Sequence, residues 1–409
     1  MKNPVALDYS QKLQDLLGVV LGAIDAPYLI LRDQEKLPKQ SGFDIDLLID
    51  EKDRSLIISL CHEYAQKHDV IAVDNTKRIA LFDLNYDNST RNWAIIDLQS
   101  KYEYGSKSLN IYEMTSMEEQ ERKTLIKDVQ DARKGRASKD VVQRLGITPY
   151  VKKEPQSLSK IQKIKRAVLL RGFFIHKHVM PFIVISGPDG VGKTTLMSNI
   201  LKLLDNLPFK TDDFHHTGLG KLQQEKIDAT QGQLKEEDMS LGRRLRRKYT
   251  PQFIKNVYGA LSGEIKYAMR INKKVVENFY SATLTFSDRY IYDRAVKMRM
   301  IKGKLVISKI TTKVNAYLMR RPTVMIVPTD SPDAIYKRKQ ELSLEEIKHY
   351  YEGLDNFINK CSIHAVHKIA VAGKTPEELA EEATYEILKS LPRDLIFRAI
   401  GMYERELKR

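Results

Sequence analysis

Hydrophobic and polar positions in the first third of the chain follow two different spacings. Apolar runs bounded by turn residues predict strands at 27–32, 43–49 and 93–98. The apolar positions of 54–68 recur with helical spacing, and the apolar stretch 16–24 predicts a buried helix. This mixture of strands and helices predicts a small α+β domain.

From about residue 181 the pattern changes to short apolar runs that alternate with helical segments. The runs predict strands at 182–186, 283–287, 323–327 and 368–373. Two of the predicted helices begin with capping-box spacing, at Ser343 with Glu346 and at Thr375 with Glu378. Such alternation predicts an α/β domain whose parallel sheet is covered by helices on both faces.

A segment rich in proline and lysine separates the two patterns. It reads PYVKKEPQSLSKIQKIKR and occupies 149–166. We therefore predict an N-terminal domain at 1–150, a basic linker or helix at 151–180 and a C-terminal domain at 181–409.

The charge is distributed unevenly between these parts. Residues 1–150 carry 21 Lys and Arg against 24 Asp and Glu, a net charge of −3, and the rest of the chain carries the remaining +18. A positive region implies anionic partners, and nucleotides, nucleic acid, acidic glycans and a lipid surface all fit that description. Charge alone does not choose among them.

The two cysteines, Cys61 and Cys361, lie far apart and form no CxxC pair. This argues against a disulfide framework or a zinc site and indicates a reducing compartment. Charged residues interrupt the most apolar stretches, so the sequence predicts no membrane span, and a cytoplasmic location is expected.

The segment GPDGVGKTT has the spacing of a Walker A phosphate loop, since Gly187 and Gly192 bracket four residues and Lys193-Thr194 follow. The glycines, including Gly190, allow backbone N–H groups to turn toward phosphate oxygens. Lys193 is expected to reach the β- and γ-phosphates, and the Thr194 hydroxyl, beside Thr195, is expected to hold Mg²⁺. The loop therefore predicts binding of a nucleoside triphosphate.

The loop together with TFSDRYIYD at 285–293 resembles the thymidylate kinase family of P-loop kinases. The segment IYKRKQEL at 335–342 is similar to the arginine-bearing lid helix of that family. The resemblance runs from about Pro181 to the C-terminus. It implies a three-layer P-loop kinase domain that uses ATP and Mg²⁺ to transfer a phosphoryl group.

The resemblance also assigns roles to single residues. Asp189 is matched to the loop acid that faces the sugar hydroxyl of the acceptor, and Arg289 to the arginine that binds the acceptor phosphate. Asp288 is matched to an acid that places a magnesium-bound water or the acceptor. Arg338, with Lys339 beside it, is expected to stabilise charge on the transferred group.

The chain departs from this family at three places, one of which is a short lid between Arg338 and Ser343 with few of the family's extra arginines. Ser186 stands where the family has an acidic residue before the first loop glycine. The aromatic and arginine pair that would hold a thymine ring cannot be placed. The acceptor therefore stays open between a nucleoside monophosphate and another phosphorylated or sugar-containing molecule.

The N-terminal part contains three carboxylates with strand spacing. Asp44 and Asp46 are two residues apart, so both leave the same face of a strand, and Asp97 closes the run WAIIDL. Three convergent carboxylates can hold two magnesium ions. The pattern SGFDID with a later Asp resembles the nucleotidyltransferase fold, which implies a metal site at these residues.

One part of the nucleotidyltransferase signature is missing. Leu31 and Arg32 stand near the place of a Gly-Ser pair that touches the triphosphate in that fold. Three interpretations stay open: a variant enzyme, a degenerate fold used for binding, and a chance resemblance.

Two further features of the C-terminal part could contact an acceptor. The run RRLRRK at 243–248 contains Arg243, Arg246 and Arg247, which share a helix face and suit an acceptor phosphate, nucleic acid or a solvated surface. His215 and His216 lie in a polar segment without further zinc ligands.

The leading hypothesis is an ATP- and Mg²⁺-dependent kinase joined to a nucleotidyltransferase-like domain. The competing hypotheses are a binding or regulatory protein switched by nucleotide, and a kinase that acts on a glycan or a nucleic-acid end. Expected partners are a nucleotide and an anionic or sugar-containing acceptor, with a homodimer as a candidate assembly.

Overall fold

The computed structural model describes residues 7–32, 34–147, 180–214, 268–290, 293, 320–360 and 363–407. The chain forms two compact units. The first unit comprises Met1–Leu158 with the short segments Asn206–Pro208 and Glu406–Arg409, and the second comprises Ser159–Asp205 and Phe209–Arg405. Most of the basic linker, the two adjacent histidines and the run at 243–248 lie outside the described residues.

The first unit begins with helix α1 (Gln11–Ala23), which Ser10 caps by accepting a hydrogen bond from the Leu13 amide. Its five-stranded sheet contains β1 (Tyr28–Ile30), β2 (Ile45–Ile49), β3 (Ile71–Asp74), β4 (Arg78–Phe82) and β5 (Trp93–Gln99). Helix α2 (Arg54–Lys67) connects β2 to β3. A small hairpin of β6 (Tyr102–Tyr104) and β7 (Lys107–Leu109) precedes α3 (Ile111–Ser116), α4 (Glu119–Arg133) and α5 (Lys139–Leu145). The predicted helices at 16–24 and 54–68 are confirmed.

The sheet of the first unit has the order β1-β2-β5-β4-β3. Strands β2 and β5 are parallel, and the other neighbours are antiparallel. Alternate residues of β2 enter two different cores: Ile45, Leu47 and Ile49 pack with α1 and α2, whereas Leu48 packs with α3, α4 and α5. The polar residue Asp46 therefore lies on the same face as Leu48.

The second unit contains a five-stranded sheet of β8 (Phe182–Ile185), β9 (Lys210–Phe214), β10 (Thr283–Ser287), β11 (Val324–Thr329) and β12 (Ala365–Ala370). Its helices are α7 (Lys193–Asp205), α13 (Pro332–Arg338), α14 (Leu344–Lys360), α15 (Pro376–Ser390) and α16 (Arg393–Leu407), together with a helix described over 268–280. Strand β12 begins three residues before the predicted range 368–373, because Ala365 already pairs with Val324 of β11.

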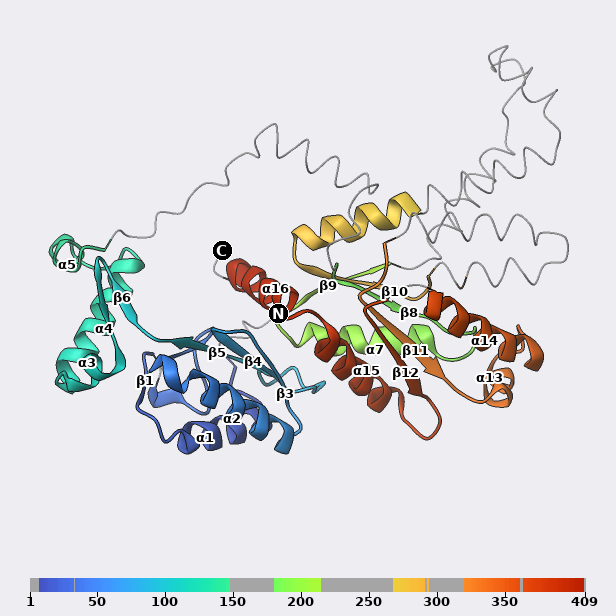
Figure 1. Ribbon diagram of the computed structural model, residues 1–409, viewed down its shortest axis with the longest axis horizontal. Helices are drawn as coiled ribbons and strands as arrows, with labels where there is room; N and C mark the ends of the chain where they lie inside the picture. The colour runs from blue at the N-terminus through green and yellow to red at the C-terminus, as the bar shows by residue number, and fades with distance from the viewer. Residues whose placement is uncertain are drawn as a thin grey trace, which may run out of the picture. The chain divides into compact units, whose positions relative to one another are not determined.

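The strand order of the second unit is β12-β11-β8-β10-β9, and all its neighbours are parallel. The helix at 268–280 and α14 pack on one face of this sheet, while α7 and α15 pack together on the other (Figure 1). This three-layer α/β arrangement is consistent with a P-loop kinase-like domain.

The order of the strands in the sheet differs from their order along the chain, and this difference indicates where a ligand would bind. From the central strand β8 the chain crosses to β9 and returns to β10 on one side, and β11 then lies on the other side of β8. The carboxyl end of β8 is thus a topological switch point, where open parallel sheets bind ligands.

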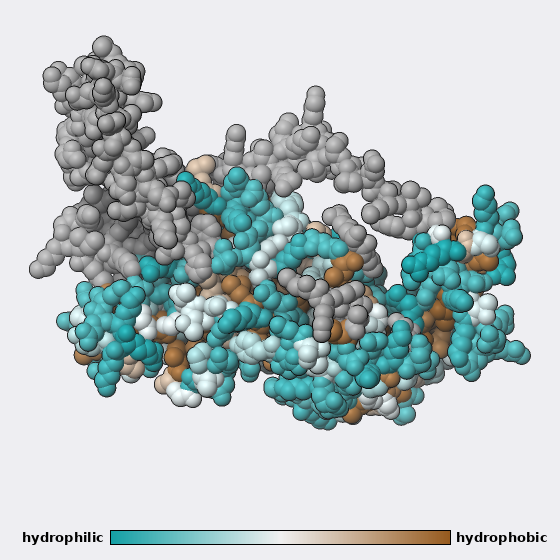
Figure 2. All heavy atoms as spheres, turned by 180° about the vertical axis from the view of Figure 1, so that it is seen from behind, coloured by the Kyte–Doolittle hydropathy of each residue, from teal (hydrophilic) through white to brown (hydrophobic). Residues whose placement is uncertain are grey.

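The described residues on the face drawn in Figure 2 are mostly polar. Among the described residues in Figure 2, hydrophilic residues cover most of the visible surface, and apolar residues are scattered between them. Within the described residues, no helix combines the length and apolar character that crossing a membrane requires.

Candidate functional site

The phosphate loop lies between β8 and α7, at the switch point of the second sheet. Gly190 and Gly192 adopt φ angles of 95° and 98°, which side chains with a Cβ atom rarely adopt. The Lys193 ammonium is turned into the loop and is 7 % exposed. It donates to the carbonyl oxygens of Gly187, at 2.5 Å, and Pro188, at 3.0 Å. The loop backbone therefore surrounds the side chain of Lys193. Thr194 and Thr195 are exposed on the first turn of α7.

Asp189 joins the loop to the segment that follows β10. Its Oδ1 atom lies 3.3 Å from Lys193 Nζ and 3.2 Å from Nη2 of Arg289. The Asp189 side chain is only 10 % exposed, so this contact between one carboxylate and two cations is largely shielded from water. Asp288, the residue before Arg289, is buried at the end of its strand. The structure thus brings Asp189, Lys193 and Arg289 together.

A buried carboxylate that the sequence did not single out lies beside the loop. Asp293 Oδ2 accepts hydrogen bonds from Ser186 Oγ at 3.1 Å and from the Tyr290 amide at 2.8 Å, and its Oδ1 accepts one from the Tyr350 hydroxyl at 2.5 Å. Burial raises the pKa of Asp293, an effect opposed by the charge of Lys193 and by these hydrogen bonds. Asp293 therefore places a carboxylate next to Ser186, although no acidic residue immediately precedes the first loop glycine in the sequence.

The end of α13 lies against the tip of the loop. A Cβ atom added at Gly190 would lie 2.9 Å from Cβ of Lys339 and 3.3 Å from the Ile335 carbonyl oxygen. Arg338 instead pairs with Asp330, which follows β11. Lys339 is thus placed close to the loop with its ammonium 3.0 Å from Glu341, and the guanidinium of Arg338 is also held by a neighbouring acid.

The three carboxylates of the first unit also come together. Ligand atoms of Asp44, Asp46 and Asp97 lie within 4.8 Å of one another. Asp46 and Asp97 are direct partners in the register of the parallel pair β2 and β5, and Asp44 immediately precedes β2 rather than lying in it. The predicted convergence on one face of the sheet is therefore present.

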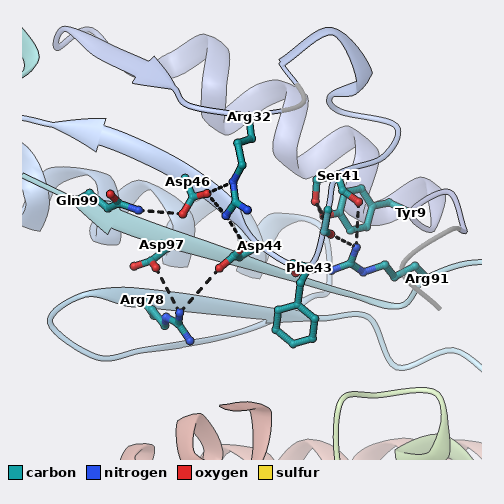
Figure 3. A network of polar contacts seen from close by, with 11 residues as sticks. Tyr9, Arg32, Ser41, Phe43, Asp44, Asp46, Arg78, Arg91, Asp97 and Gln99 are labelled. Carbon is teal, nitrogen blue, oxygen red and sulfur yellow. Dashed lines mark hydrogen bonds and ion pairs between the residues drawn. The ribbon is translucent and has the colours of Figure 1, made fainter. Parts of the chain in front are cut away.

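Polar side chains from three other positions already contact these carboxylates (Figure 3). Arg32 Nη2 lies 2.8 Å from Asp44 Oδ1, and the same guanidinium also contacts Asp46 Oδ2. Arg78 Nη2 lies 3.3 Å from Asp97 Oδ2 and 3.8 Å from Asp44 Oδ2, and Gln99 Nε2 donates to Asp46 Oδ1 at 2.8 Å. The carboxylate oxygens that metal ions would need thus face nitrogen atoms.

Burial and crowding shape the acidity of the cluster. The pKa of Asp46 is raised to about 6 by burial and by the neighbouring charge of Asp44, although Arg32 opposes this shift. Burial also raises the pKa of Asp97, against the effect of Arg78. The guanidinium groups therefore only partly offset the cost of gathering three acids.

A second arginine network holds the segment that leads into Asp44. Arg91 is buried and donates to the carbonyl oxygens of Gly42 and Phe43, both at 2.6 Å (Figure 3). Its guanidinium also stacks 3.8 Å from the ring centroid of Trp93. The backbone before the carboxylates is therefore fixed by a side chain that lies two residues before β5.

Comparison with solved structures gives a distant likeness. No protein-family model matches this sequence, and no curated protein matches it. Among solved structures, the chain is similar to a thymidylate kinase from Ehrlichia chaffeensis, with 14 % sequence identity and a TM-score of 0.32. The match covers 52 % of this chain and 100 % of that chain. Because that TM-score is low, the kinase-like character of the second unit rests on its own sheet and loop.

We predict that Gly190→Ala weakens nucleotide binding. The new Cβ would meet Lys339 and would force an unfavourable φ, at a cost of about 1–2 kcal/mol before any shift of the loop. Titration with a fluorescent ATP analogue should show roughly tenfold weaker binding. Gly401→Ala in α16 is the matched control, because no atom lies within 4 Å of its added Cβ, and it should bind like the parent. Unchanged affinity of the Gly190 variant would mean that the tip of the loop does not contact nucleotide.

Proposed function

We propose that the second unit is an ATP- and Mg²⁺-dependent phosphotransferase of the thymidylate kinase-like class. One observation carries the proposal: a phosphate loop at the switch point of a parallel sheet holds Lys193, and Asp189 connects that lysine to Arg289. Phosphate loops bind nucleoside triphosphates, and a cation across the site suits an anionic acceptor.

The residues of the loop divide the work of binding. Backbone amides of the glycine-rich segment and the ammonium of Lys193 would bind the phosphates of ATP in place of the two carbonyl contacts described above. Thr194 is the residue placed to hold Mg²⁺, which supplies positive charge to the phosphates when bound. The role of Lys193 is to stabilise charge that develops on the transferred group.

The acceptor side is formed by the residues after β10. Arg289 is proposed to bind a phosphate of the acceptor, with Asp288 beside it as the acid that orients the acceptor or a water molecule. Lys339 and Arg338 are proposed to add positive charge at the end of α13. The net charge of +18 on residues 151–409 supports an anionic acceptor, either a nucleoside monophosphate or another phosphorylated or sugar-containing molecule.

A transfer screen tests this proposal directly. Labelled ATP is offered to the full chain with Mg²⁺ and, in turn, nucleoside monophosphates, sugars, glycans and nucleic-acid ends. We expect one class of acceptor to become labelled. Tight ATP binding without transfer to any acceptor would favour a nucleotide-switched binding protein instead.

We predict that Asp189→Ala impairs use of the acceptor more than binding of ATP. Lys193 keeps its two carbonyl contacts in this variant, whereas Arg289 loses the carboxylate 3.2 Å from its guanidinium. The acceptor KM should rise roughly tenfold while the Kd for ATP changes little. Asp394→Ala, at an exposed position in the first turn of α16, is the control. Equal losses in both constants would reduce Asp189 to a residue that supports the loop.

For the first unit, a nucleotidyltransferase-like fold remains the proposal. Its support is the mixed sheet, the Gly-x-Asp-x-Asp segment that ends at Asp46, and the direct pairing of Asp46 with Asp97. Whether these carboxylates hold magnesium depends on the two arginines that contact them.

A further inference from the structure

Two arginine side chains, Arg32 and Arg78, supply positive charge to the carboxylate cluster of the first unit. Arg32 follows β1, and the Leu31 amide donates to the Asp46 carbonyl oxygen at 3.0 Å, so the backbone holds Arg32 beside β2. Its guanidinium contacts Asp46 and Asp44 together. An arginine that bridges two carboxylates uses its planar fork of donors, which a compact ammonium cannot reproduce.

Arg78 approaches the cluster from the opposite side. In the register of the sheet, Asp46 pairs with Asp97 and Asp97 pairs with Arg78, so these three residues form one row across β2, β5 and β4. Their side chains therefore leave the same face of the sheet. The position of Arg78 is fixed by strand pairing and does not depend on a long loop.

Charge and donor atoms both argue against divalent ions in this arrangement. Both oxygens of Asp44 and of Asp46 face a nitrogen atom of Arg32, Arg78 or Gln99, and so does Oδ2 of Asp97. Three carboxylates with two guanidinium groups leave a formal charge of −1. Magnesium requires several oxygen ligands at short distance, so an ion would first have to displace a guanidinium or accept its repulsion.

We propose that Arg32 and Arg78 take the place of divalent cations in this cluster, so that the first unit does not bind the metal pair that metal-dependent nucleotidyl transfer needs. Arg32 occupies the position between Asp44 and Asp46, and Arg78 occupies the position between Asp97 and Asp44. The cluster then stabilises the junction of β1, β2, β5 and β4. This proposal is independent of kinase activity in the second unit.

The test measures Mn²⁺ binding to the full chain without nucleotide, by electron paramagnetic resonance of free Mn²⁺ and by equilibrium dialysis. The parent protein and the Asp44→Asn variant should show the same saturable Mn²⁺ binding, because the cluster of the parent holds no Mn²⁺. Arg32→Ala should create a further saturable site or bind Mn²⁺ roughly tenfold more tightly or better. The double variant with Arg32→Ala and Asp44→Asn should lose that gain.

Two further variants keep the outcome interpretable. Arg144→Ala is the matched control, because it removes a guanidinium that is paired with an aspartate outside the cluster, Asp128 at 2.6 Å, and it should leave Mn²⁺ binding unchanged. Arg32→Gln replaces Arg32→Ala if the latter fails to fold, as judged by circular dichroism. A parent site abolished by Asp44→Asn overturns the proposal, and so does a folded Arg32 variant that gains no Mn²⁺ site.

Discussion

Replacing Lys193 with alanine is expected to lower the rate of phosphoryl transfer by at least about 10²-fold, because the variant loses a fixed positive charge at the phosphates. In the structure the ammonium is almost fully buried, donates to two loop carbonyls and lies 3.3 Å from Asp189. The ammonium therefore already lies inside the phosphate loop, where ATP phosphates would replace the two carbonyl contacts, and one charge in such a shielded site can be worth this much. Steady-state transfer from labelled ATP measures the effect.

Lys202→Ala provides the comparison, since Lys202 lies on the same helix α7 at an exposed position. That variant should retain parental turnover, and both variants should retain the circular dichroism and thermal midpoint of the parent. If Lys193→Ala transferred phosphate at the rate of Lys202→Ala, the loop would have no part in the reaction.

The phosphate loop could be predicted from sequence because its signals are local. Gly187, Gly192 and Lys193 lie within seven positions, and a buried strand and an amphipathic helix flank them. The carboxylate cluster was also predictable in part, since the alternation of a strand places Asp44 and Asp46 on one face. In both cases the chemistry depends on spacing along a single element.

The residues that sequence reasoning missed depend on pairing between distant segments. Asp293 meets Ser186 across 107 positions, and Tyr350 reaches it from α14. Nothing in the local pattern of 285–293 distinguishes its last aspartate from a surface acid. The contacts that Arg32 and Arg78 make with the first cluster were missed for the same reason, since the contact of Arg78 follows from the register of β4 with β5.

Short strands were a further gap. Strands β3 and β4 contain four and five residues, and periodicity alone does not distinguish apolar runs of this length from a turn of buried helix. They matter for the site nevertheless, since β4 carries Arg78 to the carboxylates. In each unit, acids are thus contacted by residues that are distant in the sequence. Arg32 and Arg78 contact the carboxylate cluster of the first unit, and Ser186 and Tyr350 contact Asp293 in the second.

Asp293→Asn is expected to stabilise the second unit while slowing phosphoryl transfer. The amide has the shape of the carboxylate and can accept the hydrogen bonds of Ser186 and Tyr290 at one atom while facing Tyr350 with the other. The variant lacks the buried carboxylate, whose pKa is raised chiefly by desolvation. The folded state therefore no longer bears the free-energy cost of burying that charge. The same change removes a negative charge that attracts the Lys193 ammonium, so the ammonium should be held less firmly where the phosphates bind, and kcat should fall on the order of tenfold.

The pH dependence of stability follows from the direction of this shift. A carboxyl group with a raised pKa binds its proton more tightly when folded, so the parent loses stability as pH rises from its ordinary value of 3.8 through the raised folded value. Above that interval the parent bears the full cost, and the variant should be more stable at neutral pH. Below that interval both side chains are neutral, and the difference should vanish. Denaturant midpoints at neutral and acidic pH measure both limits.

Tyr350→Phe separates the charge of Asp293 from its packing. It removes the 2.5 Å hydrogen bond to Asp293 Oδ1 but keeps the ring, so the carboxylate loses a donor and the unit should become less stable at neutral pH. The two variants therefore move stability in opposite directions, although both disturb the same contact. Destabilisation by Asp293→Asn at neutral pH would mean that the buried charge and its three hydrogen bonds stabilise the fold more than desolvation opposes it. A parental kcat in that variant would remove Asp293 from the positioning of Lys193.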